Sequence, residues 1–420
     1  MNTERDASPS KSSAVVTGLV ILFMTLALIV FSEHGYRATV SGLQLFFEIV
    51  LPSLLPFFIL SDVLLATGMV HALGVFFEPL MRPLFNVPGV GSFVFSMGLA
   101  AGYPMDAVLT AKFRRQGLCT KVEAERLLSF TNSADPLFIF GAVAVGMFGA
   151  PALGIGLALA HYASGIGVGL LYRFYGRRTD PPAAHQPRHR GRIVRRAFDE
   201  LYRARLEDGR PMGRVINEAI AESVSTLFMI MSFIVLFAVL LRLLQVAGLL
   251  TVLAAPFRVA FRSWGWSRAL AVPAVKGLFE IDLGAAAAAA VHTGLLPRLM
   301  LVSAIVAWSG FSVHGQVASV IQDTDISMKP YFAARFLHAV LAALLTPLFV
   351  GPALAVVGTY TLPAMAVPDF VATANPGTMA ADGFHVALVL AGLSVLSMLG
   401  AAVVVGLVRG ARVMWVRWAR

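Results

Sequence analysis

The sequence has 420 residues, and 58% of them are Ala, Val, Ile, Leu, Met, Phe, Trp, Tyr or Cys. Charged residues make up 13% of the chain, about half of the roughly 25% usual in soluble proteins, and the mean hydropathy is +0.78. A soluble fold cannot bury this much apolar surface. The composition therefore excludes a soluble globular protein and predicts an all-α polytopic membrane protein whose first partner is the lipid bilayer.

The net formal charge is +10, from 33 Lys and Arg against 23 Asp and Glu. Residues 173–214 hold 12 Arg against 5 Asp and Glu, and four more Arg follow Leu407. Basic clusters beside apolar spans mark cytoplasmic faces, so we expect a cytoplasmic loop and a cytoplasmic tail and no nucleic-acid partner. The single cysteine, Cys119, excludes an internal disulfide and a CxxC site.

Eight apolar runs are long enough to cross a bilayer, which takes about 20 helical residues. They are Ala14–Phe31, Gly42–Thr67, Phe130–Phe148, Ala152–Tyr172, Ser223–Leu244, Leu299–Ile321, Phe332–Val357 and Phe384–Leu407. No convincing small-residue cleavage site follows the first run, so we interpret it as a retained span and not as a signal peptide.

Two further apolar stretches contain helix breakers or charges. Pro88–Lys112 carries four glycines and Pro104, and Val272–His292 carries three charged residues. A broken helix at membrane depth needs protein or water around it, which predicts two re-entrant hairpins. The basic loop and the tail then lie inside, and residues 359–383 lie outside. Four arginines fall outside against the usual bias, namely Arg258, Arg262, Arg268 and Arg298.

The two halves of the chain are related by an offset of 177 residues, which pairs Pro256 with Pro79 and His338 with His161. Each half has a span, a short amphipathic stretch, a hairpin, a span interrupted by polar residues and a plain span. The first half begins outside and the second inside, which predicts inverted-topology repeats, an architecture typical of secondary transporters. We therefore divide the chain into an N-terminal transmembrane anchor (1–41), a first repeat (42–172), a basic cytoplasmic loop (173–214), an inverted second repeat (215–357) and a final part (358–420) with an external loop, a last transmembrane helix and a basic tail.

Polar residues interrupt the first repeat at two places where a transporter would bind its substrate. Gly102 and Pro104 can turn the chain around Tyr103 and leave backbone N–H groups free for an anion, although a turn or a packing face explains them as well. In Thr131–Pro136, Pro136 suits the first position of a half-helix and Asp135 its N-cap. Polar residues in mid-span are costly in lipid, which favours a role in a cavity over a simple kink.

The second repeat is interrupted at two corresponding places. Lys276 and Glu280 stand at i and i+4, so they form either a structural ion pair or an anion-binding lysine beside a coupling carboxylate. Ser309–Gln316 contains two glycines that allow unwinding, together with Ser312, His314 and Gln316 as hydrogen-bonding side chains.

These four segments supply the candidate site residues. The expected substrate-binding residues are Gly102, Tyr103, Asn132, Ser133, Lys276, Ser312, His314 and Gln316, and the expected ion- or proton-coupling residues are Asp106, Asp135, Glu280 and Asp282. The sequence has no HExxH, GxSxG or P-loop signature and no Cys/His metal grouping, so we expect neither an enzyme nor a bound metal or cofactor, apart from a coupling proton or sodium ion. Self-association into a homo-oligomer is left open.

Several short segments together resemble the family of sporulation integral membrane protein YlbJ, also called SpoVV, whose members carry two Gate or nucleoside-recognition domains. The segments are Leu51-Pro-Ser-Leu-Leu-Pro-Phe-Phe, Phe77-Glu-Pro-Leu-Met-Arg-Pro-Leu-Phe, Gly102-Tyr-Pro, Glu123-Ala-Glu-Arg-Leu, Thr131-Asn, Pro136-Leu-Phe and Gly315-Gln-Val. The resemblance extends from about Gly42 to Pro347. It implies a fold like that of concentrative nucleoside transporters, with paired hairpins and inverted repeats.

The resemblance also implies a function in endospore formation, in the mother-cell-derived outer forespore membrane. Members of the family are associated with moving dipicolinic acid, a dianion, so the implied substrate is a small carboxylate. Asp106 and Asp135 stand where the family is expected to have small or uncharged residues, which favours proton coupling or a cation-bearing substrate. A nucleoside transporter and a non-transporting sporulation scaffold remain the alternatives. A scaffold would tolerate loss of the intramembrane polar residues and depend on the Arg-rich loop.

Overall fold

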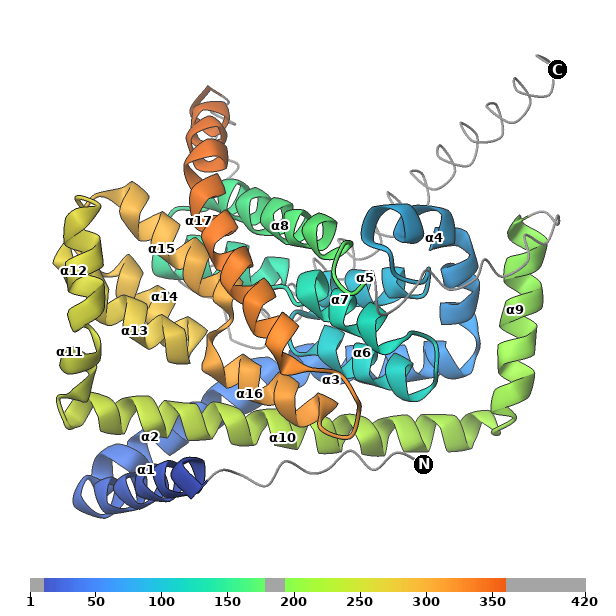
Figure 1. The fold of residues 1–420 in the computed structure, drawn as a ribbon, viewed down its shortest axis with the longest axis horizontal. Coiled ribbons are helices and arrows are strands. Elements are labelled where there is room, and N and C mark those ends of the chain that lie inside the picture. The colour runs from blue at the N-terminus through green and yellow to red at the C-terminus, as the bar shows by residue number, and fades with distance from the viewer. Residues whose placement is uncertain (1–10, 178–192, 360–420) are drawn as a thin grey trace.

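The computed structural model describes residues 11–177 and 193–359, and within these ranges every regular element is a helix (Figure 1). The first part contains α1 (Lys11–Val30), α2 (Ser32–Leu45), η1 (Phe46–Val50), α3 (Leu51–Ala66), α4 (Met69–Phe85), α5 (Gly91–Ala101), α6 (Met105–Arg115), α7 (Lys121–Thr131), η2 (Leu137–Met147) and α8 (Leu153–Tyr172). The second contains α9 (Ile193–Asp208), α10 (Met212–Val246), α11 (Leu249–Leu253), α12 (Ala255–Ser263), η3 (Arg268–Leu270), α13 (Ala271–Phe279), α14 (Ile281–Ala289), α15 (Leu295–Trp308), α16 (Gly310–Ile321) and α17 (Met328–Thr359).

Four of the described helical stretches are long and apolar enough to cross a bilayer. They are Leu153–Tyr172, Met212–Val246, Leu295–Ile321 and Met328–Gly351. The number rises to six if two bent pairs each count as one span, α1 with α2 at 102° and α3 with α4 at 83°. The all-α polytopic class is confirmed, and the total of eight spans stays a prediction. Part of the basic loop, the external loop, the span Phe384–Leu407 and the tail lie outside the described residues.

Both stretches predicted as hairpins form two short helices joined by a tight turn. In the first, α5 ends at Ala101, the following Gly102 has a φ of 71° in the left-handed region, and α6 starts at Met105. In the second, α13 and α14 meet at Glu280 and pack so closely that a Cβ on Gly284 would lie 2.2 Å from Gly277 Cα. The pairs are therefore helical hairpins, hairpin 1 (α5–α6) and hairpin 2 (α13–α14), and their re-entrance into a bilayer stays a prediction.

The expected offset of about 177 residues recurs in the bounds of the helices. The series α5, α6, α7, η2 and α8 returns as α13, α14, α15, α16 and α17. Figure 1 shows that α3 leads to α4 at the right, whereas α10 runs the other way and leads to α11 and α12 at the left. α3 and α10 run antiparallel and contact each other.

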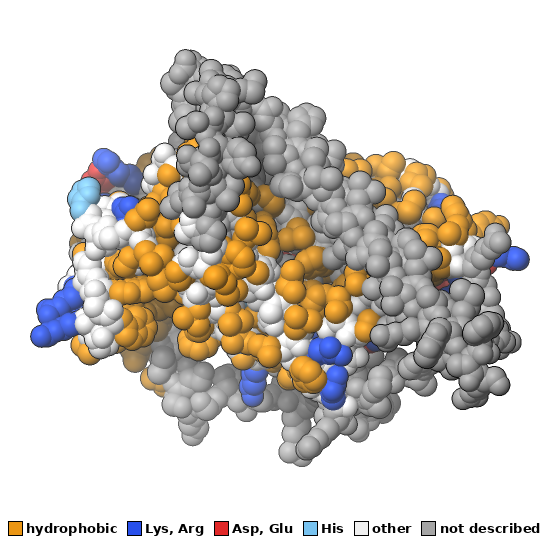
Figure 2. Space-filling view, turned by 90° about the horizontal axis from the view of Figure 1, so that it is seen from above, with side chains coloured by type: hydrophobic (Ala, Val, Ile, Leu, Met, Phe, Trp, Pro, Cys, Tyr) orange, Lys and Arg blue, Asp and Glu red, His pale blue; other side chains and the backbone are white. Residues whose placement is uncertain are grey.

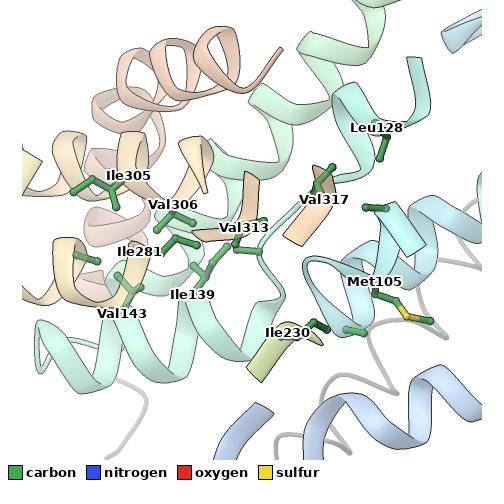
Figure 3. Packing of buried hydrophobic residues seen from close by; sticks show 14 of the residues in the cluster. Met105, Leu128, Ile139, Val143, Ile230, Ile281, Ile305, Val306, Val313 and Val317 are labelled. Atoms are coloured by element: carbon green, nitrogen blue, oxygen red, sulfur yellow. The ribbon is translucent and has the colours of Figure 1, made fainter. Parts of the chain in front are cut away.

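Contacts between the halves are reciprocal. α6 of hairpin 1 contacts α16 of the second half, and α14 of hairpin 2 contacts η2 of the first half. Figure 3 shows Ile281 of hairpin 2 beside Ile139 and Val143 of η2. The equivalent helices α8 and α17 also pack on each other, with the ring centroids of His161 and His338 4.8 Å apart. Such contacts between equivalent residues are expected of halves related by a two-fold axis, and the inverted repeat itself stays a prediction.

Candidate functional site

The first interrupted helix breaks between α7 and η2, where residues 132–135 are not helical. The next helix begins at Pro136, which has no N–H group that would need a partner. Asp135 Oδ1 accepts a hydrogen bond from Phe138 N at 2.9 Å. The predicted N-cap is confirmed. The predicted span Phe130–Phe148 therefore covers the end of α7, an extended segment and η2, and the extended segment leaves buried backbone groups without helical partners.

Asn132 fills this first break and is fully buried. Its amide nitrogen donates to Asp106 Oδ1 at 3.0 Å, and its amide oxygen accepts from the Tyr331 hydroxyl, also at 3.0 Å. Thr131 Oγ1 donates to the other oxygen of Asp106 at 3.3 Å. The Asn132 side chain thus connects hairpin 1, the first break and α17. It also supplies a hydrogen bond to the buried Asp106 carboxylate, whose burial would otherwise be costly.

The second interrupted helix breaks at Ser309 and Gly310, with φ of 70° and 68°. Gly310 lies against the turn of hairpin 2, because a Cβ there would approach Phe279 O to 3.0 Å and Glu280 Cα to 3.2 Å. Glu280 is extended and its carboxylate accepts from Leu283 N at 2.8 Å, as the N-cap of α14. Trp308 Nε1 donates to Leu278 O at 3.1 Å and ties the two turns together.

Arg335 of α17 joins the two breaks and is fully buried. One guanidinium nitrogen donates to Asn132 O at the first break, and the other donates to Ala307 O, two residues before Ser309. The first nitrogen also lies 3.0 Å from His338 Nδ1. The fork geometry of arginine suits two divergent carbonyl oxygens that have no helical partner. Phe332–Val357 was predicted as a plain span and Arg335 was not among the predicted site residues, although an arginine inside an apolar run is itself a signal.

The two equivalent histidines continue this network, and both are buried. Ala134 N donates to His161 Nε2 at 3.1 Å, and Ser133 Oγ lies 3.1 Å from the same nitrogen. His338 Nε2 lies 2.9 Å from His161 O. These contacts make His161 a neutral ring that accepts at Nε2 and His338 a ring that donates from Nε2. Neither histidine was among the predicted site residues.

His314 lies at the start of α16 among aromatic rings. Its Nδ1 is 2.7 Å from Gly310 O, and the four rings around it are those of Trp308, Phe311, Tyr331 and Phe332, with centroid distances of 4.4, 5.9, 5.1 and 4.7 Å. Nε2 is buried and has no hydrogen-bond partner among the described residues. The second break therefore presents flat apolar faces and one available imidazole nitrogen.

The other predicted site residues occupy the hairpins and α16. Gly102 packs against Asp135, and the Tyr103 hydroxyl reaches Val306 O at 3.4 Å, so the turn of hairpin 1 touches both halves. Asp282 lies in the first turn of α14. Ser312 and Gln316 are buried on α16, close to the second break.

Of the two alternatives for Lys276 and Glu280, the structural ion pair is not formed. Among the described residues no carboxylate oxygen lies within 4.0 Å of Lys276 Nζ, because the helix ends at Phe279 and Glu280 turns to cap α14. Within the same part of the chain, no three His, Cys, Asp or Glu side chains are arranged to hold a metal ion.

The central residues are packed against one another. A void of about 10 Å³ lies beside His161, bounded by η2, α8 and α15, which is room for about one water molecule. A larger pocket of about 340 Å³ lies elsewhere, between α3, α4, α6, α9 and α10. Lys112 crosses it and pairs with Asp62 at 2.8 Å and Glu222 at 3.1 Å. A ligand at the breaks would require the hairpins to move.

Residues 11–177 and 193–359 thus define a class: a multi-pass α-helical membrane protein with two helical hairpins, two interrupted helices and a buried arginine between them. The Gate family, described as nucleoside recognition, matches residues 47–151. The chain is 44% identical over 343 residues to sporulation integral membrane protein YlbJ of Bacillus subtilis (strain 168), covering 82% of this chain and 84% of that protein. It belongs to the YlbJ family of sporulation integral membrane proteins. No solved structure matches it.

Proposed function

We propose that the protein is a secondary transporter of a small carboxylate metabolite, with its substrate site at the two breaks and the turns of the two hairpins. The observation that carries this proposal is the pairing of breaks at matched positions, joined by Arg335. Interrupted helices leave backbone groups free to meet a substrate, and transporters place them near the midplane of the membrane. A scaffold has no need of such costly buried polar groups.

An anionic substrate is favoured by the cations and N–H groups at this centre. Arg335 is fully buried, and Lys276 carries no carboxylate partner among the described residues. η2 and α16 begin at the two breaks, and the N–H groups of their first turns are further donors for an anion there. Dipicolinate, implied by the family, has two carboxylates that suit two such places, and its route would cross the outer forespore membrane.

The acidic residues suit coupling to a proton or sodium ion. Asp135 borders the turn of hairpin 1, and Glu280 and Asp282 form the turn of hairpin 2. In this proposal they bind the coupling ion, and the antiparallel α3 and α10 belong to inverted repeats that exchange access to the two sides.

A nucleoside is the second candidate substrate, favoured by the rings of Trp308, Tyr331 and Phe332 around His314. Aromatic faces at this spacing can stack on a base. The two substrates make different demands on Lys276, since only the carboxylate needs a cation.

Uptake into proteoliposomes tests the proposal. Labelled dipicolinate and labelled uridine are offered under imposed proton or sodium gradients, with wild type, Lys276→Ala and Lys329→Ala, the last an exposed lysine in the first turn of α17. We expect gradient-driven dipicolinate uptake that Lys276→Ala lowers by at least about tenfold and Lys329→Ala leaves unchanged. Uridine uptake unaffected by Lys276→Ala selects the nucleoside. No uptake of either compound by intact protein, together with sporulation defects confined to variants of the Arg-rich loop, selects the scaffold.

A further inference from the structure

The short helices α11 and α12 lie across the end of α10, at the opposite end of the molecule from α9 (Figure 1). Since α10 has 35 residues and is a candidate span, helices that cross its end lie along a membrane face. Figure 2 shows Lys and Arg side chains at this left end and hydrophobic side chains over the middle of the visible face. The region therefore combines the position and the composition of an interfacial helix.

The arginines here have no acidic partners. Residues 247–279 contain Arg258, Arg262 and Arg268 and not one Asp or Glu. Among the described residues no carboxylate oxygen lies within 4.0 Å of these three guanidinium groups. Arg298 is different, because it donates to Ala289 O at 2.7 Å and lies over the Phe148 ring at 5.4 Å, so its function is structural.

Large apolar side chains beside these arginines are exposed. Val252 is 67% exposed, Val259 72% and Trp264 63%. Trp264 also contacts Phe261 and Trp266, whose rings form one aromatic cluster with it. Tryptophan and arginine side by side, with apolar residues on the same short helix, are typical of the boundary between lipid headgroups and acyl chains.

The equivalent helix in the first half is built differently. α4 corresponds to α11 and α12 by the offset of the repeat, and α9 covers it, with Leu201 O so close to Gly68 that a Cβ there would clash. Its charges are paired, since Arg82 binds Glu78 at 2.7 Å. α12 packs on its sequence neighbours α11, η3 and α13 through the buried Phe261, and it leaves Val259 and Arg262 exposed and Arg258 half-buried.

We propose that α11 and α12 bind the headgroups of anionic phospholipids at the membrane face opposite the Arg-rich loop. Arg258, Arg262 and Arg268 hold phosphate oxygens with their planar forks, while Val259 and Trp264 enter the adjoining acyl layer. This also explains why three arginines stand on the face where the positive-inside rule disfavours them: their charge is neutralised by lipid phosphates. The site is independent of whether the protein transports anything.

The test uses full-length protein in nanodiscs. A Cys119→Ala, Val259→Cys protein is labelled with a fluorescent bimane, and quenching is compared between bilayers holding equal fractions of brominated phosphatidylglycerol or brominated phosphatidylcholine. Leu344→Cys in the same background is the matched control, because Leu344 is 62% exposed on α17, away from α12. Arg258→Gln with Arg262→Gln removes two of the three cations, the first half-buried and the second exposed, and a monodisperse profile of this variant shows that it folds.

We expect phosphatidylglycerol to be enriched at Val259 by about fivefold for each arginine that holds it. The enrichment should fall to about the fivefold that Arg268 alone supplies in the double variant, and toward the control value in high salt. Equal and strong quenching by both lipids means that α12 meets acyl chains without selecting headgroups, and it overturns the proposal. Absence of quenching by either lipid means that another protein or a second copy covers α12, and it overturns the proposal as well.

Discussion

At the first break, between α7 and η2, the chain is held by side chains. Asn132 binds Asp106 and Tyr331, and Ser133 lies within hydrogen-bonding distance of His161. At the second break, between α15 and α16, the chain is held by its backbone conformation, with Ser309 and Gly310 both at positive φ and aromatic rings around His314. Both halves therefore have a helix break at a matched position, but the side chains around the two breaks differ in chemistry. The polar network, to which both halves contribute, surrounds the first break, and the flat apolar faces surround the second.

Arg335 makes the two breaks depend on each other, and its loss gives the largest expected effect. Arg335→Gln leaves at least one of Asn132 O and Ala307 O without a donor in the interior, so we expect the unfolding free energy to fall by about 2–4 kcal/mol. Arg335→Lys restores the charge but not the fork, and it should recover only part of the loss. Thermal melting in detergent measures both, with the exposed Arg203→Gln as a control that should melt with the wild type. An Arg335→Gln protein as stable as wild type would show that the breaks are independent.

The side-chain character of the first break predicts an asymmetry between Asn132 and Ser309. Asn132→Ala removes partners from Asp106 and Tyr331, which should cost about 2–3 kcal/mol. Ser309→Gly relieves a non-glycine residue at φ 70°, so stability should be unchanged or rise by up to about 1 kcal/mol. The same melting experiment compares them. Equal destabilisation by the two substitutions would remove the distinction between the breaks.

The backbone character of the second break is tested at Gly310. Gly310→Ala adds a Cβ at φ 68° that meets Phe279 O at 3.0 Å, whereas Gly248→Ala adds one at φ 75° with no heavy atom within 4 Å. We expect about 2 kcal/mol of destabilisation at Gly310 and about 1 kcal/mol at Gly248, the difference being contact with hairpin 2. Equal losses in chemical denaturation would place hairpin 2 away from the break in solution.

The smallest expected effect concerns an ion pair between the halves. Arg114 at the end of α6 binds both oxygens of Asp325 at 2.8 and 2.9 Å and lowers the pKa of that carboxyl. Because the folded pKa is depressed, the stabilisation is present above the unfolded value of about 3.9 and is lost as the pH falls through the folded pKa. Asp325→Asn should lower stability by less than about 1 kcal/mol at pH 7, since the pair is partly exposed, and by progressively less as the pH falls below the unfolded value of about 3.9. A difference that does not change with pH assigns the effect to something other than this pair.

The sequence predicted the parts of this site whose signal is local. Glycine and proline marked the turn of hairpin 1, and Asp135 before Pro136 marked a new helix start, because caps and turns are set by neighbouring residues. The charges in Val272–His292 marked the second hairpin for the same reason. The matched breaks followed from polar residues in apolar runs.

The residues that join the breaks could not be predicted in the same way. Arg335 stands three residues inside the expected span Phe332–Val357, where an arginine can reach the membrane surface, and only the start of α17 at Met328 puts it two turns deep. Tyr331 meets Asn132 from 199 residues away, and Lys276 loses Glu280 because the helix ends between them. Such contacts depend on how helices pack, which the periodicity of one chain does not specify.

Hydrogen–deuterium exchange with and without substrate tests the central claim most directly, because it reports where a ligand acts. The protein in nanodiscs is measured with dipicolinate, with uridine and with neither, following the segments around Asn132–Asp135, Ser309–Gly310 and the pocket that Lys112 crosses. If the matched breaks form the site, the transported compound slows exchange at both breaks together and leaves the pocket unchanged. A transported compound that slows exchange only around Asp62, Lys112 and Glu222 would contradict the account.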